Sequence, residues 1–292
     1  MTRSPVHIAL ASDDRGTVGL AVTVHSLLRH TRRPVQVWIV EDGIDRSTQA
    51  RLAASWKGAG LLAATHFLAQ KDLPIKPPVW WARDAWPLAS CSRFQLGDVL
   101  PPEVSRCIYL DINILVGTDV GALFDHDLRG FPVAMVPNYG MSETDRQYVT
   151  SIGLDPDQYC NTGVMLMDLD AWRQENAGIG LFEQGRSMPP DIWFFDQDML
   201  NTYFKGRCLL LDKRWNYRDA GVMPDGHIQH FAGKPKPWNT RTEEATSVGL
   251  VAWHRARAET GYVPPSPSKF VQIKRQLVVN LARIQRRLLR MM

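Results

Sequence analysis

The feature that most constrains the fold of this chain is the order of apolar runs in its first third. Apolar runs at 6–11 and 35–40 are followed by segments at 20–29 and 48–57 that are expected to be helical, the first with apolar residues at helical spacing. Short apolar strands that alternate with helices are typical of βαβ units, whose strands are parallel. The pattern therefore predicts one α/β domain with a mainly parallel central sheet flanked by helices.

The rest of the chain offers further candidate elements. A helix at 90–100 should end before the prolines at 101 and 102. With 292 residues, of which 45% are hydrophobic and 22% charged, the chain has the composition of an ordinary globular protein with ample length for a core. The remaining expected strands are at 61–68, 107–111, 114–116, 131–136, 163–167, 209–211 and 227–231.

Neither a signal peptide nor a membrane span is expected. The apolar run at 6–11 is too short for the apolar region of a signal peptide, and no run approaches the ~20 residues that cross a bilayer. The four cysteines form no CxxC pair, which disfavours zinc-site spacing and a disulfide framework. We therefore expect a cytoplasmic protein with reduced cysteines. The cysteines are Cys91, Cys107, Cys160 and Cys208.

The positive charge of the chain is concentrated at its C-terminal end. The net charge is +4, yet residues 268–292 hold seven Lys and Arg and no acid, so the remaining chain has 27 basic and 30 acidic residues. No nucleic-acid partner is expected for such a body. The apolar residues of the tail recur every three or four positions: Phe270, Ile273, Leu277, Leu281, Ile284 and Leu288.

This spacing predicts a basic amphipathic helix that suits an anionic membrane surface. The division expected from it is a domain at 1–262, a Pro-rich linker at 263–268 and a membrane-associating tail at 269–292. Alternatively, the helix packs on the body or on another subunit. Trp253, Tyr262 and Phe270 are candidate interfacial anchors, and core packing is an equal alternative for Trp253.

Two oxygen-bearing side chains interrupt the apolar segment at 109–116. Asp111 and Asn113 are two residues apart, so in a strand they would point to the same side. Oxygen ligands of this kind suit Mg²⁺ or Mn²⁺ bound to a diphosphate. The alternative is a strand end with turn-forming residues. Because ligands on parallel sheets lie beyond the carboxyl ends of the strands, the loop at 12–16 and the segment 111–113 should meet there.

Several familiar signatures are absent: the chain has no Gly-rich phosphate loop, no HExxH and no GxSxG. This disfavours Rossmann dehydrogenases, Walker-type NTPases, zinc proteases and serine hydrolases. Five other segments occur instead, together with Arg93 in Ser-Arg-Phe-Gln-Leu. They are Ala11-Ser12-Asp13-Asp14, Asp111-Ile112-Asn113, the run Tyr-Cys-Asn-Thr-Gly-Val-Met-Leu-Met-Asp at 159–168, Asp-Gln-Asp-Met-Leu-Asn at 196–201, and His-Phe-Ala-Gly-Lys-Pro-Lys-Pro-Trp at 230–238.

In this order, these segments resemble the family 8 glycosyltransferases, retaining GT-A enzymes that use UDP-sugars and Mn²⁺. The resemblance runs from about residue 6 to residue 238 and is nearest to bacterial enzymes of lipopolysaccharide or lipooligosaccharide synthesis. It implies that Asp111, Asn113 and His230 hold Mn²⁺, with Mg²⁺ possible, and that Asp196 and Gln197 act at the reaction centre. The nucleotide-sugar site that it implies comprises Ala11, Ser12, Asp13, Asp14, Arg15, Gly16, Arg93, Asp111, Ile112, Asn113, Asn161, Thr162, Asp196, Gln197, Gly233 and Lys236.

Within that set the resemblance implies separate roles. Asp13 and Asp14 would contact uridine, with a loop cap as the alternative, and Gly233 and Lys236 would approach phosphate. Arg93 and Asp196 would hold sugar hydroxyls, while Asn161 and Thr162 would line the donor pocket. Alone, Arg93 could equally be a surface charge and His230 a structural histidine.

The resemblance also implies an activity: transfer of galactose or glucose from a UDP-sugar to a lipid-linked glycan, such as lipopolysaccharide core, at the inner face of the membrane. Gln197 is a poor nucleophile, so front-face attack by the acceptor is expected, with phosphate as proton acceptor. One alternative is a family member that acts on a protein or soluble glycan. The other is a non-catalytic nucleotide-sugar-binding protein.

Two positions depart from the family pattern, and one aromatic cluster has no assigned role. Asn113 stands where the family has Asp, which removes one negative charge from the expected metal site. The loop Arg15-Gly16-Thr17 lacks the aromatic that often stacks on uracil. Trp80, Trp81 and Trp86 precede Arg93 and are expected either to stack on an acceptor sugar or to pack in the core.

Overall fold

The computed structural model describes residues 4–78, 81, 88–219, 221–222, 224–265 and 269–289. A seven-stranded sheet with the order β3-β2-β1-β4-β7-β6-β8 crosses the body, and a two-stranded sheet joins β5 and β9. The strands are β1 (Val6–Asp13), β2 (Val35–Asp42), β3 (Leu62–Ala69), β4 (Arg106–Leu110), β5 (Ile114–Val116), β6 (Val133–Pro137), β7 (Cys160–Asp168), β8 (Cys208–Leu210) and β9 (Ile228–His230).

The large sheet is mainly parallel, as predicted. Strands β1, β2, β3 and β4 pair in parallel, and so do β6 and β8. Strand β7 runs antiparallel to both of its neighbours, β4 and β6. The carboxyl ends of β1 and β4 therefore lie at the same edge of the sheet, where the candidate site is expected.

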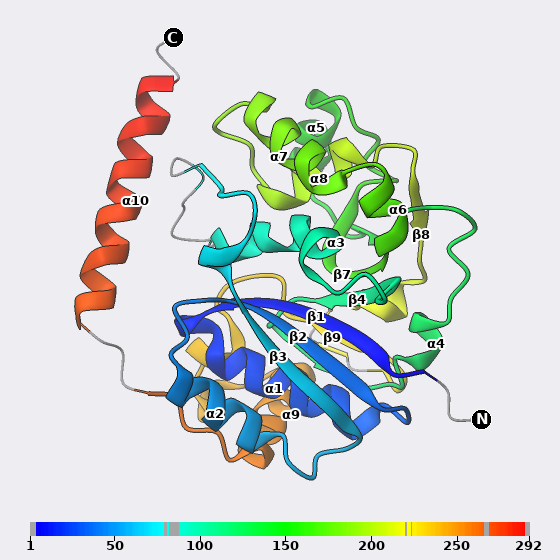
Figure 1. The fold of residues 1–292 in the computed structure, drawn as a ribbon, viewed down its shortest axis with the longest axis vertical. Coiled ribbons are helices and arrows are strands. Elements are labelled where there is room, and N and C mark those ends of the chain that lie inside the picture. The colour runs from blue at the N-terminus through cyan, green and yellow to red at the C-terminus, as the bar shows by residue number, and fades with distance from the viewer. Residues whose placement is uncertain are drawn as a thin grey trace.

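Helices cover both faces of this sheet (Figure 1). The α-helices are α1 (Thr17–His30), α2 (Arg46–Ser55), α3 (Leu96–Val99), α4 (Gly121–Phe124), α5 (Glu143–Ser151), α6 (Leu169–Gln174), α7 (Ala177–Ser187), α8 (Asp196–Tyr203), α9 (Val248–Thr260) and α10 (Lys269–Leu289). The short 3₁₀ helices are Asp14–Gly16, Gln70–Asp72, Leu88–Gln95, Lys213–Asn216, Pro237–Asn239 and Thr242–Glu244.

Alternate residues of the inner strands pack into two separate hydrophobic cores, one on each face of the sheet. Ile8 and Leu10 of β1 pack in the core that contains helices α1 and α9, whereas Ala9 and Ala11 pack in the core that contains α7 and α8. Because successive side chains of a strand point to opposite faces, a strand covered on both faces is apolar throughout. This explains why the first strands are continuous apolar runs in the sequence.

Polar side chains define where several helices begin. Asp45 accepts a hydrogen bond from the Thr48 N–H at the start of α2, and Ser142 forms a capping box with Asp145 at the start of α5. Such caps satisfy N–H groups that have no partner within the helix. The expected helix at 90–100 is instead a 3₁₀ helix at Leu88–Gln95 followed by the single turn of α3, which ends before Pro101.

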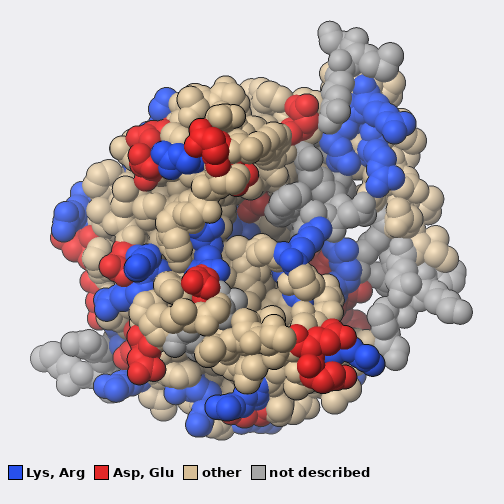
Figure 2. Space-filling model, turned by 180° about the vertical axis from the view of Figure 1, so that it is seen from behind, with Lys and Arg blue, Asp and Glu red and all other residues tan. Residues whose placement is uncertain are grey.

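The C-terminal helix α10 stands apart from the α/β body in Figure 1. Its residues Ile273, Leu277, Leu281, Ile284 and Leu288 are each between 55% and 61% exposed, whereas Ala282 is buried. Figure 2 shows a patch of basic side chains on this helix. Residues 261–265 before it have no regular secondary structure, and 266–268 lie outside the described residues. None of the described helices is long and apolar enough to cross a membrane.

Several aromatic residues proposed as anchors or sugar contacts belong to the core instead. Trp253 is fully buried and Tyr262 nearly so, and both pack in the core beside α1, so neither is an interfacial anchor. Trp81 is also buried, stacked on Phe182 with ring centroids 5.4 Å apart, which rules out stacking on an acceptor sugar. Trp80, Trp86 and the side chain of Phe270 lie outside the described residues. The four cysteines are free thiols.

Candidate active site

The loop after β1 and the segment after β4 meet at the carboxyl edge of the sheet, as the sequence predicts. A Cβ atom added to Gly16 would lie 2.2 Å from Ile112 Cδ1, and one added to Gly19 would lie 2.5 Å from the Ile112 carbonyl oxygen. The start of α1 therefore packs directly against the segment Asp111-Ile112-Asn113. Glycine at both positions permits this approach, because any side chain would collide with Ile112.

The local geometry of that segment differs from the prediction. Residues 111–113 form a turn between β4, which ends at Leu110, and β5, which begins at Ile114, so Asp111 and Asn113 do not share a strand face. The Thr23 hydroxyl, from α1, lies 2.9 Å from the Ile112 carbonyl and 2.8 Å from the Ile114 carbonyl. The turn is thus held by α1 together with two backbone hydrogen bonds, from the Asp111 N–H to the Gly163 carbonyl and from the Phe231 N–H to the Asn113 carbonyl.

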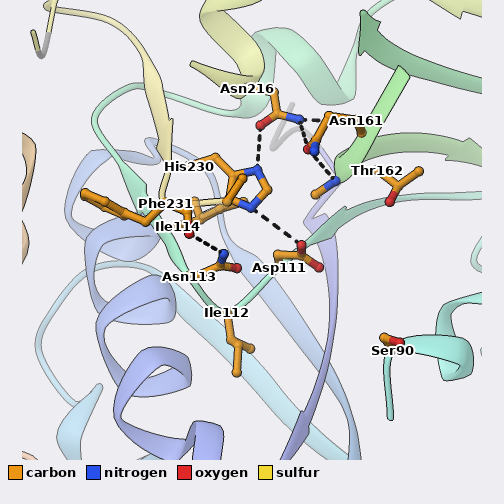
Figure 3. A network of polar contacts seen from close by, with 12 residues as sticks. Ser90, Asp111, Ile112, Asn113, Ile114, Asn161, Thr162, Asn216, His230 and Phe231 are labelled. Carbon is orange, nitrogen blue, oxygen red and sulfur yellow. Dashed lines mark hydrogen bonds and ion pairs between the residues drawn. The ribbon is translucent and has the colours of Figure 1, made fainter. Parts of the chain in front are cut away.

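Asp111, Asn113 and His230 lie around one point of the cleft (Figure 3). His230 Nε2 is 3.6 Å from Asp111 Oδ2. The Asn113 amide nitrogen donates to the Phe231 carbonyl at 2.8 Å, which orients that amide. Among the described residues, no three His, Cys, Asp or Glu side chains gather into a metal site. A cation here would instead need the Asn113 amide as its third ligand.

The state of His230 suits metal binding. Its Nδ1 lies 2.9 Å from Asn216 Oδ1, an acceptor, so Nδ1 carries the proton and Nε2 keeps its lone pair. Nε2 is buried and has no hydrogen-bond partner in the structure. Burial lowers the pKa of His230 to about 3, despite the opposing effect of Asp111, so the ring is neutral. A neutral imidazole with a free nitrogen facing a carboxylate fits a divalent cation that accepts nitrogen and oxygen ligands.

Arg93 is buried beside this group and is not a surface charge. Its guanidinium lies 2.9 Å from Asp111 Oδ1 and 3.3 Å from Asp196 Oδ2, and it donates to the Thr162 carbonyl at 2.9 Å. Burial alone would raise the pKa of Asp111, but Arg93 holds it below its usual range. For Asp196, burial outweighs Arg93 and raises the pKa to about 6.

A chain of amides links the imidazole to Gln197. Asn216 donates to Asn161 Oδ1 at 2.8 Å, and Asn161 donates to Gln197 Oε1 at 2.9 Å. Because Asn216 also accepts from His230, the orientations of all four side chains are coupled. Asn161 and Gln197 are therefore brought together as expected. Asn216 belongs to none of the five segments, and no motif in the sequence marks it.

Asp196 and Gln197 open helix α8 behind a strained residue. Phe195 has φ of +50°, a value that bulky side chains rarely adopt. Two tyrosines fix the start of the helix: Tyr148 and Tyr159 donate to the Asp198 carboxylate at 2.7 and 2.5 Å. Trp81 packs edge-on against Phe195, with centroids 6.0 Å apart. These contacts with buried residues thus fix the start of α8 and, with it, the positions of Asp196 and Gln197.

The remaining predicted residues belong to the end of β1, to the turn after it and to the segment after β9. Asp13 is buried and caps the turn after β1, accepting from the Arg15 and Gly16 N–H groups, and Arg15 Nε donates to its carboxylate at 2.8 Å. The expected loop cap is therefore present, and contact of Asp13 with uridine stays a prediction. Lys236 Nζ lies 3.3 Å from the Phe231 carbonyl and near enough to Asp111 to lower its pKa. A Cβ added to Gly233 would meet no atom within 4 Å, so space is open beside it.

Comparison with known proteins agrees with this architecture. The family model described as glycosyl transferase family 8 matches residues 7–242. The probable galacturonosyltransferase-like 9 of Arabidopsis thaliana is 28% identical over 264 residues, which cover 80% of this chain and 67% of that protein. The lipopolysaccharide 1,3-galactosyltransferase of Salmonella typhimurium is 23% identical over 250 residues, which cover 80% of this chain and 73% of that protein.

A similar solved structure is that of the galactosyltransferase LgtC in complex with donor and acceptor sugar analogues. Its TM-score is 0.74 at 23% identity, and the alignment covers 89% of this chain and 98% of that chain. This likeness confirms the GT-A fold predicted from the sequence.

Replacing Gly163 tests how the imidazole is held. A Cβ added to Gly163 would lie 2.2 Å from His230 Cε1, so Gly163→Ala should displace the ring and break its bond to Asn216. We expect unfolding in urea to show a loss of about 1–3 kcal/mol, and Mn²⁺ binding by calorimetry to weaken at least tenfold. Gly233→Ala, where the added carbon meets nothing within 4 Å, should keep its stability. Equal stability of the two variants would contradict this account.

The raised pKa of Asp196 predicts a pH dependence of stability. Its pKa is about 6 in the fold and near its ordinary value of 3.8 in the unfolded chain, so the folded state takes up the proton first as pH falls. As the pH falls from 7 to 4.5, protonation of this buried carboxyl group therefore raises the stability of the fold, an effect that Asp196→Asn cannot show. The free energy of unfolding of the metal-free wild type, relative to that variant, should rise by roughly 2 kcal/mol over this range. Urea unfolding at several pH values measures it, and a constant difference would refute the assignment.

Proposed function

The chain belongs to glycosyltransferase family 8, and on this premise we propose that it transfers a hexose, galactose or glucose, from a UDP-sugar to a glycan acceptor with retention of configuration. The matched segment, 7–242, spans nearly all of the α/β body. The names of two relatives, a galacturonosyltransferase-like protein and a lipopolysaccharide galactosyltransferase, support a nucleotide-sugar donor and a glycan acceptor.

The observation that carries the proposal is the unpartnered Nε2 of His230 facing Asp111, beside the amide of Asn113. These three residues would hold a divalent cation, and the imidazole favours Mn²⁺ over Mg²⁺. When bound, such a cation supplies positive charge that stabilises the diphosphate of the departing UDP. Lys236 would add a point charge to the same phosphates, and the open space at Gly233 would let them approach the backbone.

The surroundings of Asp196 and Gln197 support front-face attack. A double displacement needs a free carboxylate at the anomeric carbon, but Asp196 is paired with Arg93, and the Gln197 amide is a poor nucleophile. In the proposed reaction, an acceptor hydroxyl oxygen bonds to the anomeric carbon as the bond to the β-phosphate oxygen breaks. The hydroxyl proton passes to a phosphate oxygen of UDP. Gln197 and Asp196 hold the sugar in place, with Asn161 and Arg93 fixing their orientation.

Helix α10 supports a lipid-linked acceptor. Five apolar side chains along one face, from Ile273 to Leu288, are more than half exposed, and basic residues lie on the same helix. A helix of this kind lies in the surface of an anionic membrane, with the apolar face inserted. We therefore propose that the enzyme acts at the inner membrane surface, on a glycolipid such as lipopolysaccharide core.

Titration of UDP into the protein tests the metal site. Calorimetry should show tight UDP binding with Mn²⁺ present and at least tenfold weaker binding without it. His230→Ala should abolish the effect of Mn²⁺, whereas His126→Ala, at an exposed histidine, should leave it unchanged. UDP binding that ignores Mn²⁺ would favour a non-catalytic nucleotide-sugar-binding protein, in which Asn113 has replaced the usual carboxylate. Release of UDP from UDP-galactose or UDP-glucose then distinguishes turnover from binding.

Vesicle co-sedimentation tests the tail. The full chain should sediment with vesicles that contain anionic phosphatidylglycerol and not with pure phosphatidylcholine. Removing 269–292, or introducing the pair Leu277→Gln and Leu281→Gln, should abolish sedimentation. Leu61→Gln, at an apolar residue 54% exposed on the body, serves as the matched control and should sediment normally. Sedimentation of the truncated chain would instead assign membrane contact to the body.

A further inference from the structure

Arg218 is a cation beside the candidate site that no residue of the proposed reaction uses. It follows Asn216 by two positions, and the intervening Tyr217 has extended backbone with φ of −79° and ψ of 124°. Asn216 points at His230, and Arg218 is near enough to that imidazole for its charge to act on the pKa of His230. Tyr217, between them, packs against His227.

The neighbours of Arg218 place it near the donor pocket. Its guanidinium donates to the Asn138 side chain and to the Tyr139 carbonyl, and lies 4.6 Å from the centroid of the Tyr139 ring. These residues follow the end of β6, where Pro137 pairs with Cys160 and Val136 with Asn161. Arg218 therefore lies at the same edge of the sheet as Asn161.

This position is separate from the proposed diphosphate site. Asp111 faces Nε2 of the His230 ring, whereas Asn216 bonds to Nδ1 on the other side. Arg218 lies beyond Asn216, about 6–7 Å further along the chain at the rise of extended backbone. An anion at Arg218 would therefore lie on the Asn216 side of the imidazole, away from the nitrogen that faces Asp111.

In the part of the chain that the structure describes, Arg218 has no counterion. Among the described residues, its partners are an amide, a carbonyl and an aromatic ring, and no carboxylate forms an ion pair with it. Its Nε is buried without a hydrogen-bond partner. Burial lowers the pKa of this guanidinium, which nevertheless stays charged. A partly buried guanidinium whose partners are all neutral gains from an anionic group that accepts further hydrogen bonds from its terminal N–H groups.

We propose that Arg218 binds a carboxylate or phosphate group of a sugar substrate, so that the enzyme acts on an acidic sugar. The inference rests on the proposed function, because it assigns a substrate class to the same cleft. Two sources have this chemistry: a carboxylate or phosphate on the acceptor glycan, and the carboxylate of a hexuronosyl donor, which would then replace galactose or glucose as the transferred sugar. A guanidinium suits either one, since its planar fork forms paired hydrogen bonds to both groups.

The experiment compares wild type, Arg218→Gln and Arg218→Lys with Arg214→Gln, an exposed arginine four residues earlier. UDP binding with Mn²⁺ is measured first on all four proteins. The donor arm then compares UDP-galacturonate with UDP-galactose. The acceptor arm titrates glucose 6-phosphate, glucuronate and glucose into protein saturated with UDP and Mn²⁺.

Wild type should bind an acidic probe at least tenfold more tightly than its neutral counterpart in one of the two arms, and that arm identifies the source. Arg218→Gln should lose the preference while still binding UDP, Arg218→Lys should keep part of it, and Arg214→Gln should keep it all. Equal affinity of wild type for acidic and neutral probes overturns the inference, even if Arg218→Gln fails to fold. A preference for the acidic probe that Arg218→Gln retains also overturns the inference. If wild type does not bind UDP, the proposed function is overturned, and this inference with it.

Discussion

Arg93 lies buried between two carboxylates, 2.9 Å from Asp111 and 3.3 Å from Asp196, and this ion cluster joins three parts of the fold. Asp111 follows β4, Asp196 opens α8, and the Thr162 carbonyl that Arg93 also binds belongs to β7. Removing one member of a buried ion cluster leaves an uncompensated charge, typically at a cost of about 3–5 kcal/mol. The arrangement of the side chains in the cleft therefore depends on the Arg93 guanidinium. Arg93 belongs to the 3₁₀ helix Leu88–Gln95, which lies between the sheet and α7.

The charge balance of the cluster explains its chemistry. Asp111 and Asp196 both pair with Arg93, Lys236 also lies near Asp111, and the imidazole of His230 is neutral. Burial is the main cause of the raised pKa of Asp196, and the charge of Asp111 adds to it. The divalent cation that we propose at Asp111 would add positive charge beside both carboxylates.

A guanidinium with no carboxylate partner among the described residues lies on the other side of the His230 ring. There Arg218 lies among neutral partners, beyond the amides of Asn216 and Asn161. His230 thus separates two environments: carboxylates paired with cations around Asp111, and the guanidinium of Arg218 among neutral groups. In the proposed complex, the diphosphate and the anionic group of the sugar substrate would bind on opposite sides of this imidazole.

The sequence by itself determined the α/β class, the strands of the sheet and the five segments that assemble into the cleft. Apolar periodicity and loop composition are local properties, and both β1 and β4 end in polar loops that a parallel sheet brings together. Only the tertiary structure decided the details. Asp111 and Asn113 occupy a turn held by Thr23 of α1, Asp13 caps its own loop, Trp81 and Trp253 are buried, and Asn216 orients His230. Each of these depends on contacts between residues far apart in the chain, or on backbone dihedral angles that a residue type does not specify.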